Sequence, residues 1–285
     1  MTPRAGSGIP GSAAGSFVLA HVSDLHVGAH LPEIAEALVA DVEAVRPDLT
    51  VVTGDCTMRA RPDQFRAARL LLDRLPAPRL VVLGNHDVPL FAAARLLSPY
   101  ARYRVEIQPD LDPLVDLAGL RALGLQSMPR WRWKGGRVSR RQATFVAELP
   151  CAAPATSVRL VALHHPPFAI GPARIAGRAA LLRALAAARV DLVLAGHTHV
   201  PRSRAVELGR AGGGTHRLIE VVAGTATSTR TRGAARSWTV IRVDRTAVAV
   251  EVRAERAGRW STGHTARYPR DQGVSGGSGA VPLGR

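Results

Sequence analysis

The sequence predicts an α/β fold, and three observations lead to that prediction. Hydrophobic residues make up 46% of the 285 residues, which is ample material for a buried core. Over the first two thirds of the chain, short apolar runs alternate with segments whose apolar positions recur at helical spacing. After about Arg217 the strand-like runs continue without helices between them.

Six strands are expected from apolar runs, most of which lack polar alternation, as strands covered on both faces should. They are Phe17 to Val22, Leu49 to Thr53, Leu80 to Leu83, Arg121 to Leu125, Val158 to Leu163 and Leu192 to Ala195.

Helices are expected in the intervening segments Pro32 to Val45, Pro62 to Leu75 and Arg178 to Ala188. Pro32 and Pro62 suit the first turn of a helix, where no backbone N–H is needed. Ser139 and Gln142 have the spacing of a capping box, which predicts a further helix starting there.

The last third predicts strands only, at Leu218 to Val222, Ser237 to Val243 and Ala247 to Arg253. Asp244 and Arg245 interrupt the last two and predict a hairpin. Because no linker-like stretch precedes these strands, we expect them to add a second layer or sheet to the same core.

We therefore expect one domain over residues 17–268. Residues 1–16 and 269–285 are rich in Gly, Ser or Pro and are expected to form a flexible leader and a flexible tail. No apolar run reaches the length of a membrane span, and Cys56 and Cys151 are the only cysteines. These features predict a cytoplasmic protein.

The chain is strongly basic, with 38 basic against 22 acidic residues and a net charge of +16. Such a charge favours nucleic acid, anionic membranes or phosphorylated substrates as partners. Lys134 is the only lysine, and the abundance of arginine, alanine, glycine and valine also fits the codon bias of a GC-rich genome.

Five short segments concentrate the residue types that bind metals, and each directly follows a predicted strand. They are Ser23-Asp24-Leu25-His26, Gly54-Asp55, Gly84-Asn85-His86-Asp87, His164-His165-Pro166-Pro167 and Gly196-His197-Thr198-His199. The loops at the carboxyl ends of strands in an open α/β sheet converge, so these segments are expected to share one cleft.

The number and type of donors predict two metal ions. In extended backbone, residues two apart point the same way, so Asp24 with His26, and His197 with His199, are expected to act as pairs. Seven donors suit two ions about 3.5–4 Å apart when one carboxylate bridges them. The oxygen donors are Asp24, Asp55 and Asn85, and the nitrogen donors are His26, His164, His197 and His199. Asp55 is the expected bridge, and a set without thiolates fits manganese, iron or zinc.

In this order, the segments resemble the calcineurin-like metallophosphoesterase superfamily, whose pattern is D-x-H, G-D, G-N-H-D/E, H-x-P and G-H-x-H. The resemblance covers roughly residues 17–200 and implies a four-layer α/β/β/α sandwich with a dinuclear site at the carboxyl ends of the strands. It assigns one metal to Asp24, His26, Asp55 and His199, and the other to Asp55, Asn85, His164 and His197. In the histidine pair it selects His164 as the ligand and leaves His165 as a neighbour.

The resemblance also implies the reaction, which is hydrolysis of a phosphoester by a metal-bridging hydroxide, with His86 donating a proton or hydrogen bond to the leaving oxygen. One departure affects His86. The phosphatase branch of the superfamily orients this histidine with a carboxylate, where this chain has Met58. Asp87 is the candidate replacement.

Several other polar residues have weaker signals. His21 lies inside a predicted strand and is expected to be structural, as is Cys56, which should face away from the bridging Asp55. His30 is a candidate for lining the cleft.

The sequence allows two roles for each of two arginine-containing segments. Arg59 and Arg61 are candidates either for a substrate-phosphate contact or for the surface. The segment 130–134 with Arg137, Arg140 and Arg141 interleaves Trp131 and Trp133 with cations. This segment can bind nucleic acid, with bases stacked on the tryptophans and phosphates bound by the cations, or it can form a solvated loop.

Three functions follow, in order of preference. The first is hydrolysis of a small phosphodiester such as a 3′,5′-cyclic nucleotide or a glycerophosphodiester, because the sequence looks most like the bacterial class III cyclic nucleotide phosphodiesterases and their glycerophosphodiesterase relatives. The second is a nuclease, for which the arginine excess would bind the nucleic acid backbone. The third, a non-catalytic scaffold on the same fold, ranks last because all the ligands are present.

Overall fold

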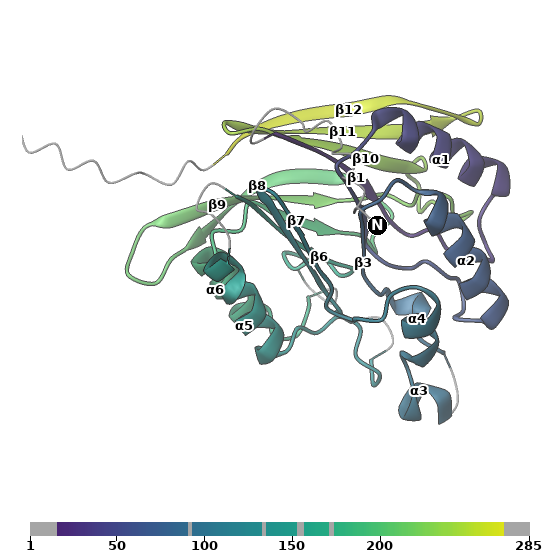
Figure 1. Ribbon diagram of the computed structural model, residues 1–285, viewed down its shortest axis with the longest axis horizontal. Helices are drawn as coiled ribbons and strands as arrows, with labels where there is room; N and C mark the ends of the chain where they lie inside the picture. Colours follow the sequence, from purple (N-terminus) through teal and green to yellow (C-terminus); the bar gives the residue numbers. More distant parts are fainter. Residues whose placement is uncertain (1–15, 91–92, 133–134, 153–156, 171–173, 271–285) are drawn as a thin grey trace, which may run out of the picture.

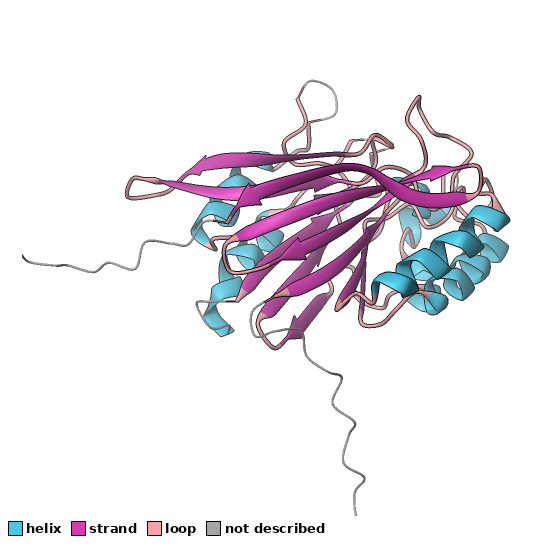
Figure 2. Ribbon diagram, turned by 90° about the horizontal axis from the view of Figure 1, so that it is seen from above, coloured by secondary structure: helices cyan, strands magenta, loops and turns pink. Residues whose placement is uncertain are grey.

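The structure of the chain is a computed structural model that describes residues 16–90, 93–132, 135–152, 157–170 and 174–270. Two six-stranded sheets pack face to face, with helices on their outer faces (Figures 1 and 2). None of the described helices has the length and apolar character that crossing a membrane requires.

The first sheet has the order β12-β11-β10-β1-β2-β3. Its parallel part consists of β1 (Phe17–Val22), β2 (Leu49–Val52) and β3 (Arg79–Val81). The antiparallel part consists of β10 (Ser237–Val243), β11 (Ala247–Arg256) and β12 (Arg259–Pro269). The C-terminal strands therefore extend the sheet that begins at the N-terminus.

The second sheet has the order β4-β5-β6-β7-β9-β8. Its strands are β4 (Leu114–Leu117), β5 (Leu120–Leu125), β6 (Val158–Leu163), β7 (Leu192–Ala195), β8 (Arg202–Gly209) and β9 (Thr215–Val222). Strands β5, β6, β7 and β9 are parallel, while β4 and β8 are antiparallel edges.

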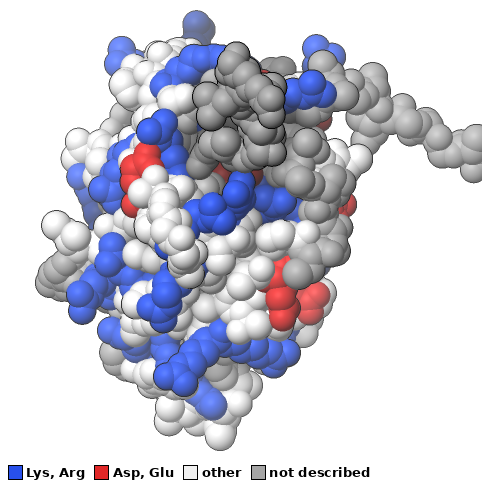
Figure 3. Space-filling view, turned by 90° about the vertical axis from the view of Figure 1, so that its left-hand side faces the viewer, with Lys and Arg blue, Asp and Glu red and all other residues white. Residues whose placement is uncertain are grey.

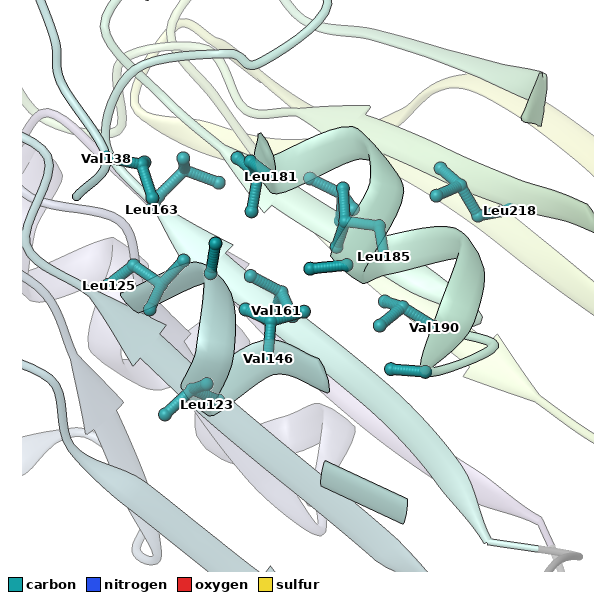
Figure 4. Packing of buried hydrophobic residues seen from close by; sticks show 14 of the residues in the cluster. Leu123, Leu125, Val138, Val146, Val161, Leu163, Leu181, Leu185, Val190 and Leu218 are labelled. Atoms are coloured by element: carbon teal, nitrogen blue, oxygen red, sulfur yellow. The ribbon is translucent and has the colours of Figure 1, made fainter. Parts of the chain in front are cut away.

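Three of the four buried apolar clusters formed by the described residues define four layers. Side chains such as Leu19, Leu160 and Ile241 fill the space between the sheets. Helices α1 (Pro32–Val45) and α2 (Pro62–Arg74) cover the outer face of the first sheet. Helices α5 (Arg140–Glu148) and α6 (Arg178–Ala187) cover the second (Figure 4). The α/β/β/α sandwich expected from the resemblance is confirmed.

The buried strands agree best with the sequence predictions. Strands β1, β6, β7 and β10 begin and end where expected, as does helix α1. The predicted capping box is present, since the Ser139 hydroxyl accepts from the Gln142 backbone N–H and the Gln142 side-chain oxygen accepts from the Ser139 N–H.

Among the described residues, three strands and two α-helices have no counterpart among the predictions. Strands β4, β8 and β12 lie at sheet edges, and helices α3 (Ala93–Leu97) and α4 (Ala101–Glu106) are short. The C-terminal strands also do not form a layer of their own, because β9 joins β7 and β10 joins β1.

The expected tail begins at a residue that the structure places in a strand. Pro269 ends β12, and the Arg270 guanidinium donates to Asp191 at 2.7 Å. The rest of the expected tail, residues 271–285, and residues 1–15 of the expected leader lie outside the described residues.

Candidate metal centre

The five metal-binding segments come from both sheets, following β1, β2 and β3 in one and β6 and β7 in the other. Backbone hydrogen bonds join their loops. The Asp24 N–H donates to the Gly54 carbonyl at 3.0 Å, and the Gly196 N–H donates to the His164 carbonyl at 3.0 Å. All seven expected ligands consequently lie in one cluster at the carboxyl ends of the strands.

One half of the cluster contains Asp24, His26 and His199, which are all buried. The Nε2 atoms of His26 and His199 lie 3.1 Å apart. Oδ1 of Asp24 lies 3.0 Å from Nε2 of His199 and 3.7 Å from Nε2 of His26. Three donor atoms therefore surround one point.

The other half contains Asn85, His164 and His197. Oδ1 of Asn85 lies 3.1 Å from Nε2 of His164 and 3.0 Å from Nδ1 of His197. The two ring nitrogens are 3.2 Å apart.

Asp55 lies between the two halves. Its Oδ2 atom is 3.6 Å from Nε2 of His26 in one half and 3.4 Å from Nε2 of His164 in the other. This is the position that a carboxylate shared by two ions would occupy.

Each carboxylate has one oxygen held by the protein and one directed into the cluster. Oδ2 of Asp24 accepts from the Ser23 hydroxyl at 2.6 Å and from the His197 N–H at 3.0 Å. Oδ1 of Asp55 accepts from the His86 N–H at 2.8 Å. The remaining oxygens, Oδ1 of Asp24 and Oδ2 of Asp55, are the ones that approach the histidines.

Two histidines have the tautomer that ligation requires. Nδ1 of His164 lies 2.7 Å from the Thr53 carbonyl oxygen, and Nδ1 of His199 contacts the carbonyl of Arg230. A carbonyl only accepts, so each Nδ1 carries a hydrogen. When the ring is neutral, as a metal ligand must be, Nε2 directs its lone pair into the cluster.

These contacts test whether the residues fit divalent cations, and they fit. Oδ1 of Asp24 is a buried oxygen that accepts no hydrogen bond from a described residue. In each of the pairs His26–His199 and His164–His197, a nitrogen of one ring lies 3.1–3.2 Å from a nitrogen of the other. A cation bound between these atoms would accept the lone pairs that otherwise face one another. The mixed set of oxygen and nitrogen donors suits manganese, iron or zinc.

The backbone at the cluster is in an uncommon conformation. Five of the seven expected ligands have positive φ, namely Asp24 at 53°, His26 at 49°, Asp55 at 52°, His197 at 70° and His199 at 61°. The expectation that extended backbone would pair these side chains is therefore wrong. They lie in left-handed turns just after the strands, a conformation that costs about 1–3 kcal/mol per residue and occurs mainly where function requires it.

Two glycines allow the loops to approach one another. A Cβ atom on Gly84 would lie 2.1 Å from the backbone nitrogen of Asp55, and one on Gly196 would lie 1.9 Å from the Ser23 hydroxyl oxygen. No other residue type fits at these positions without displacing a proposed ligand.

The electrostatics of the cluster reflect buried opposite charges. Burial alone would raise the pKa of Asp24, but His199, His26 and the charge of His164 hold that pKa well below its usual range. Burial lowers the pKa of His164, yet the neighbouring Asp55 and Asp24 raise it to about 9. The pKa of His197 falls to about 4, because burial and the charge of His164 both disfavour its protonation.

His86 lies beside this cluster and is held by a group that the sequence did not reveal. Its Nδ1 atom lies 2.8 Å from the backbone carbonyl oxygen of Met58. Its ring packs edge-on against His26 with centroids 4.7 Å apart, and one ring nitrogen lies within 4.8 Å of donor atoms of His26 and Asp55. The Met58 position therefore orients His86 through its carbonyl, where the phosphatase branch uses a side-chain carboxylate.

Asp87 does not orient His86, so that candidate role is wrong. Its carboxylate accepts from the backbone N–H groups of Gly84, Cys56 and Thr57 at 2.8–3.2 Å. Burial and the charge of Asp55 raise its pKa to about 6. Asp87 fastens the loop that carries His86 to the loop that carries Asp55.

The residues expected to be structural pack accordingly. His21 is buried with Nε2 3.0 Å from the Thr53 hydroxyl, and Cys56 is buried in the apolar core. His165 lies behind the cluster, with Nδ1 2.8 Å from the Ser127 hydroxyl and its ring 4.6 Å from that of His197. His30 is half-exposed and accepts from the Gly28 N–H.

The tryptophan and arginine segment lies partly within the described residues. Trp131 is 59% exposed, while Trp133 and Lys134 lie outside the described residues. Arg59 and Arg61 are exposed on the loop after Asp55, and a phosphate contact there stays a prediction.

Comparisons with known proteins agree with the motifs. A family model described as calcineurin-like phosphoesterase matches residues 17–201. The chain is 31% identical over 206 residues to the cAMP/cGMP dual specificity phosphodiesterase of Mycobacterium tuberculosis, covering 64% of this chain and 62% of that protein. It is 28% identical over 170 residues to the glycerophosphodiester phosphodiesterase GpdQ of Enterobacter lignolyticus, covering 56% and 60%. The chain thus spans less than two thirds of the length of these relatives.

The fold also matches a solved structure of low sequence identity. The purple acid phosphatase PPD1 of yellow lupin (Lupinus luteus) seeds is 13% identical and superimposes with a TM-score of 0.62, covering 89% of this chain and 54% of that one. At this identity the likeness concerns the fold alone.

Proposed function

The chain belongs to the calcineurin-like phosphoesterase family, and from that premise we propose that it is a metal-dependent phosphodiesterase acting on a small phosphodiester. A 3′,5′-cyclic nucleotide or a glycerophosphodiester is the proposed substrate class. The relatives named above are phosphodiesterases of these two kinds, which is what favours the class.

The observation that carries the proposal is the convergence of seven oxygen and nitrogen donors. In Asp24, Asp55, His164 and His199 the other polar atom is already held by the protein. Asp24, His26, His199 and Asp55 are the proposed ligands of one ion. Asp55, Asn85, His164 and His197 are the proposed ligands of the second. Two divalent cations bound there supply activation of water and neutralisation of phosphate charge.

The remaining chemistry falls to the protein's own residues. Because the Met58 carbonyl can only accept, Nδ1 of His86 carries a hydrogen and Nε2 is its free nitrogen. We place this Nε2 at the leaving oxygen, to which it delivers a proton when the ring is doubly protonated. The edge-on contact with His26 places the ring beside the proposed ligands.

The experiment compares hydrolysis of bis-p-nitrophenyl phosphate, p-nitrophenyl phosphate and cyclic AMP by the chain reconstituted with manganese, iron or zinc. We expect activity that depends on added metal and prefers the diester to the monoester. Equal rates with and without every metal would overturn the hydrolase assignment, and a preference for the monoester would overturn the substrate class.

A nuclease is the second candidate, and one observation favours it. Arginine side chains are spread over the molecular face in Figure 3, where acidic residues are few. Degradation of single-stranded DNA with a steep loss of rate on adding salt, faster than hydrolysis of the small diesters, would favour this candidate.

A further inference from the structure

A cavity of about 560 Å³ lies apart from the metal centre, lined by side chains of α4, the loops on either side of the β4–β5 hairpin, and α5. Its volume is within the range of small-molecule pockets. Neither His86 nor any of the seven proposed metal ligands lines it. It is therefore a separate feature of the fold that the proposed reaction does not use.

Three guanidinium groups face this cavity, from Arg104 on α4, Arg137 in the loop and Arg141 on α5. We call the cavity the arginine pocket. None of the three side chains makes an ion pair or a hydrogen bond to a described residue, and each is exposed. Elsewhere in the described part of the chain many arginines are paired, as Arg74 is with Glu36 and Arg253 with Asp41. Asp110 and Asp112 also line the cavity, so three guanidinium groups stand against two carboxylates. This excess of positive charge favours an anionic ligand.

The walls of the arginine pocket are aromatic. The Arg137 guanidinium lies 5.5 Å from the centroid of the Trp131 ring, and the Arg141 guanidinium lies 5.2 Å from that of Phe145. Tyr100 completes the aromatic lining, with its hydroxyl donating to the Met128 carbonyl at 2.9 Å. Aromatic faces beside guanidinium planes are the surfaces on which nucleic acid bases stack.

The polar groups at the base of the arginine pocket are held in a fixed network. Asp112 accepts from the Gln126 N–H and from the Gln142 side-chain amide, both at 2.7 Å. Gln142 is only 7% exposed and also caps α5 through Ser139. The pocket is thus built before a ligand arrives, which lowers the cost of ordering it.

The arginine pocket is separate from the metal centre, but side-chain contacts link the two. Gln126 lines the pocket, and the next residue, Ser127, contacts His165 at 2.8 Å. The ring of His165 then packs on His197. Because no proposed metal ligand lines the pocket, we expect a ligand to bind there without metal.

We propose that the arginine pocket binds a nucleoside monophosphate, with its phosphate at the guanidinium groups and its base against the aromatic walls. An inorganic anion would leave the aromatic surface unused, and a neutral aromatic compound would leave the excess positive charge of the lining unbalanced. A nucleoside monophosphate uses both features. The proposal stands on the cavity alone and does not depend on the reaction catalysed at the metals.

The test is equilibrium dialysis of labelled 5′-AMP against the full chain, both metal-loaded and treated with chelator. In the chelator-treated chain we expect one AMP per chain. Replacing one guanidinium, as in Arg104→Gln, should weaken binding about tenfold, the loss of one charge-assisted hydrogen bond. Trp131→Ala should weaken it to a similar extent, about tenfold, through lost stacking.

The chain offers matched controls on the same helices. Arg102 on α4 and Arg140 on α5 are exposed and do not line the cavity. Arg102→Gln and Arg140→Gln should change the affinity less than twofold, which separates contact with the ligand from a general effect of charge.

Four results would overturn the proposal. The first is absence of AMP binding to the chelator-treated chain, and the second is an equal loss of AMP affinity in Arg104→Gln and Arg102→Gln. The third is binding of inorganic phosphate or adenosine as tight as that of AMP. The fourth is Arg104-dependent binding of a short single-stranded oligonucleotide that is tighter than that of AMP. The last result would assign the pocket to nucleic acid.

Discussion

The metal centre and the arginine pocket hold their charged groups in opposite ways. In the metal centre, most of the carboxylates and imidazoles are buried. The second polar atoms of Asp55, His164 and His199 are fixed by backbone groups, as Asp55 is by the His86 N–H. In the arginine pocket, the guanidinium groups are exposed and have no such partners among the described residues.

The difference indicates two kinds of site. Buried donors with preset directions suit an ion of fixed coordination, and they cost the fold strained backbone at residues such as His197. Exposed cations on helices and loops suit a ligand that brings its own charge. Each prediction below separates the two sites or tests their independence.

The largest effect is expected for Asp55→Asn, because Asp55 is proposed to serve both ions. We expect the variant to lose at least one bound metal and its activity to fall to that of the metal-free chain. Metal content measured by mass spectrometry, together with hydrolysis of bis-p-nitrophenyl phosphate, checks this. Asp63→Asn, at an exposed residue of α2, is the control. Two bound ions and normal turnover in Asp55→Asn would show that Asp55 is not the bridging ligand.

The next effect is expected for His86→Ala, which should keep both ions. We expect turnover to fall by about 10²–10⁴-fold, the contribution typical of a general acid. Metal content and rate measured on the same sample separate loss of chemistry from loss of metal. His264→Ala, on exposed β12, is the control. Full activity of His86→Ala would exclude His86 from the mechanism.

A smaller effect is expected for Ser23→Ala, which removes the hydroxyl that fixes Oδ2 of Asp24. Groups that orient a metal ligand typically contribute about 10–100-fold to metal affinity or activity. Titration of the apoprotein with manganese, read by activity, should show weaker binding of this size. Ser261→Ala on β12 should bind as the parent does. An unchanged affinity in Ser23→Ala would show that Asp24 needs no such support.

The smallest effect on hydrolysis is expected for Trp131→Ala, because Trp131 lines the arginine pocket and not the metal centre. Metal content and turnover should stay within twofold of the parent even while AMP binding weakens. A large loss of turnover with p-nitrophenyl substrates would mean that the two sites are one.

The metal-binding segments could be predicted because they follow buried strands. Apolar runs such as Val158–Leu163 and Leu192–Ala195 fix where a strand ends, and thus where the next polar residues lie. The anchoring groups could not be predicted in the same way. The carbonyls of Met58 and Thr53 belong to residues whose side chains carry no signal of that role.

The missed elements are short, as β4 and α3 are, or have little apolar pattern. Strand β12 is mostly exposed and reads as polar, and β8 is arginine-rich at a sheet edge. Helix α4 has six residues, two of them arginine, and only Tyr103 is buried. Since α4 forms a wall of the arginine pocket, the pocket could not be predicted without it.

Anomalous diffraction from crystals grown with manganese would locate the bound ions and their ligands. We predict two ions about 3.5–4 Å apart, as in dinuclear phosphoesterase sites. Asp55 should contact both, with Asp24, His26 and His199 around one ion and Asn85, His164 and His197 around the other. A single ion, or ions bound away from these side chains, would contradict the account.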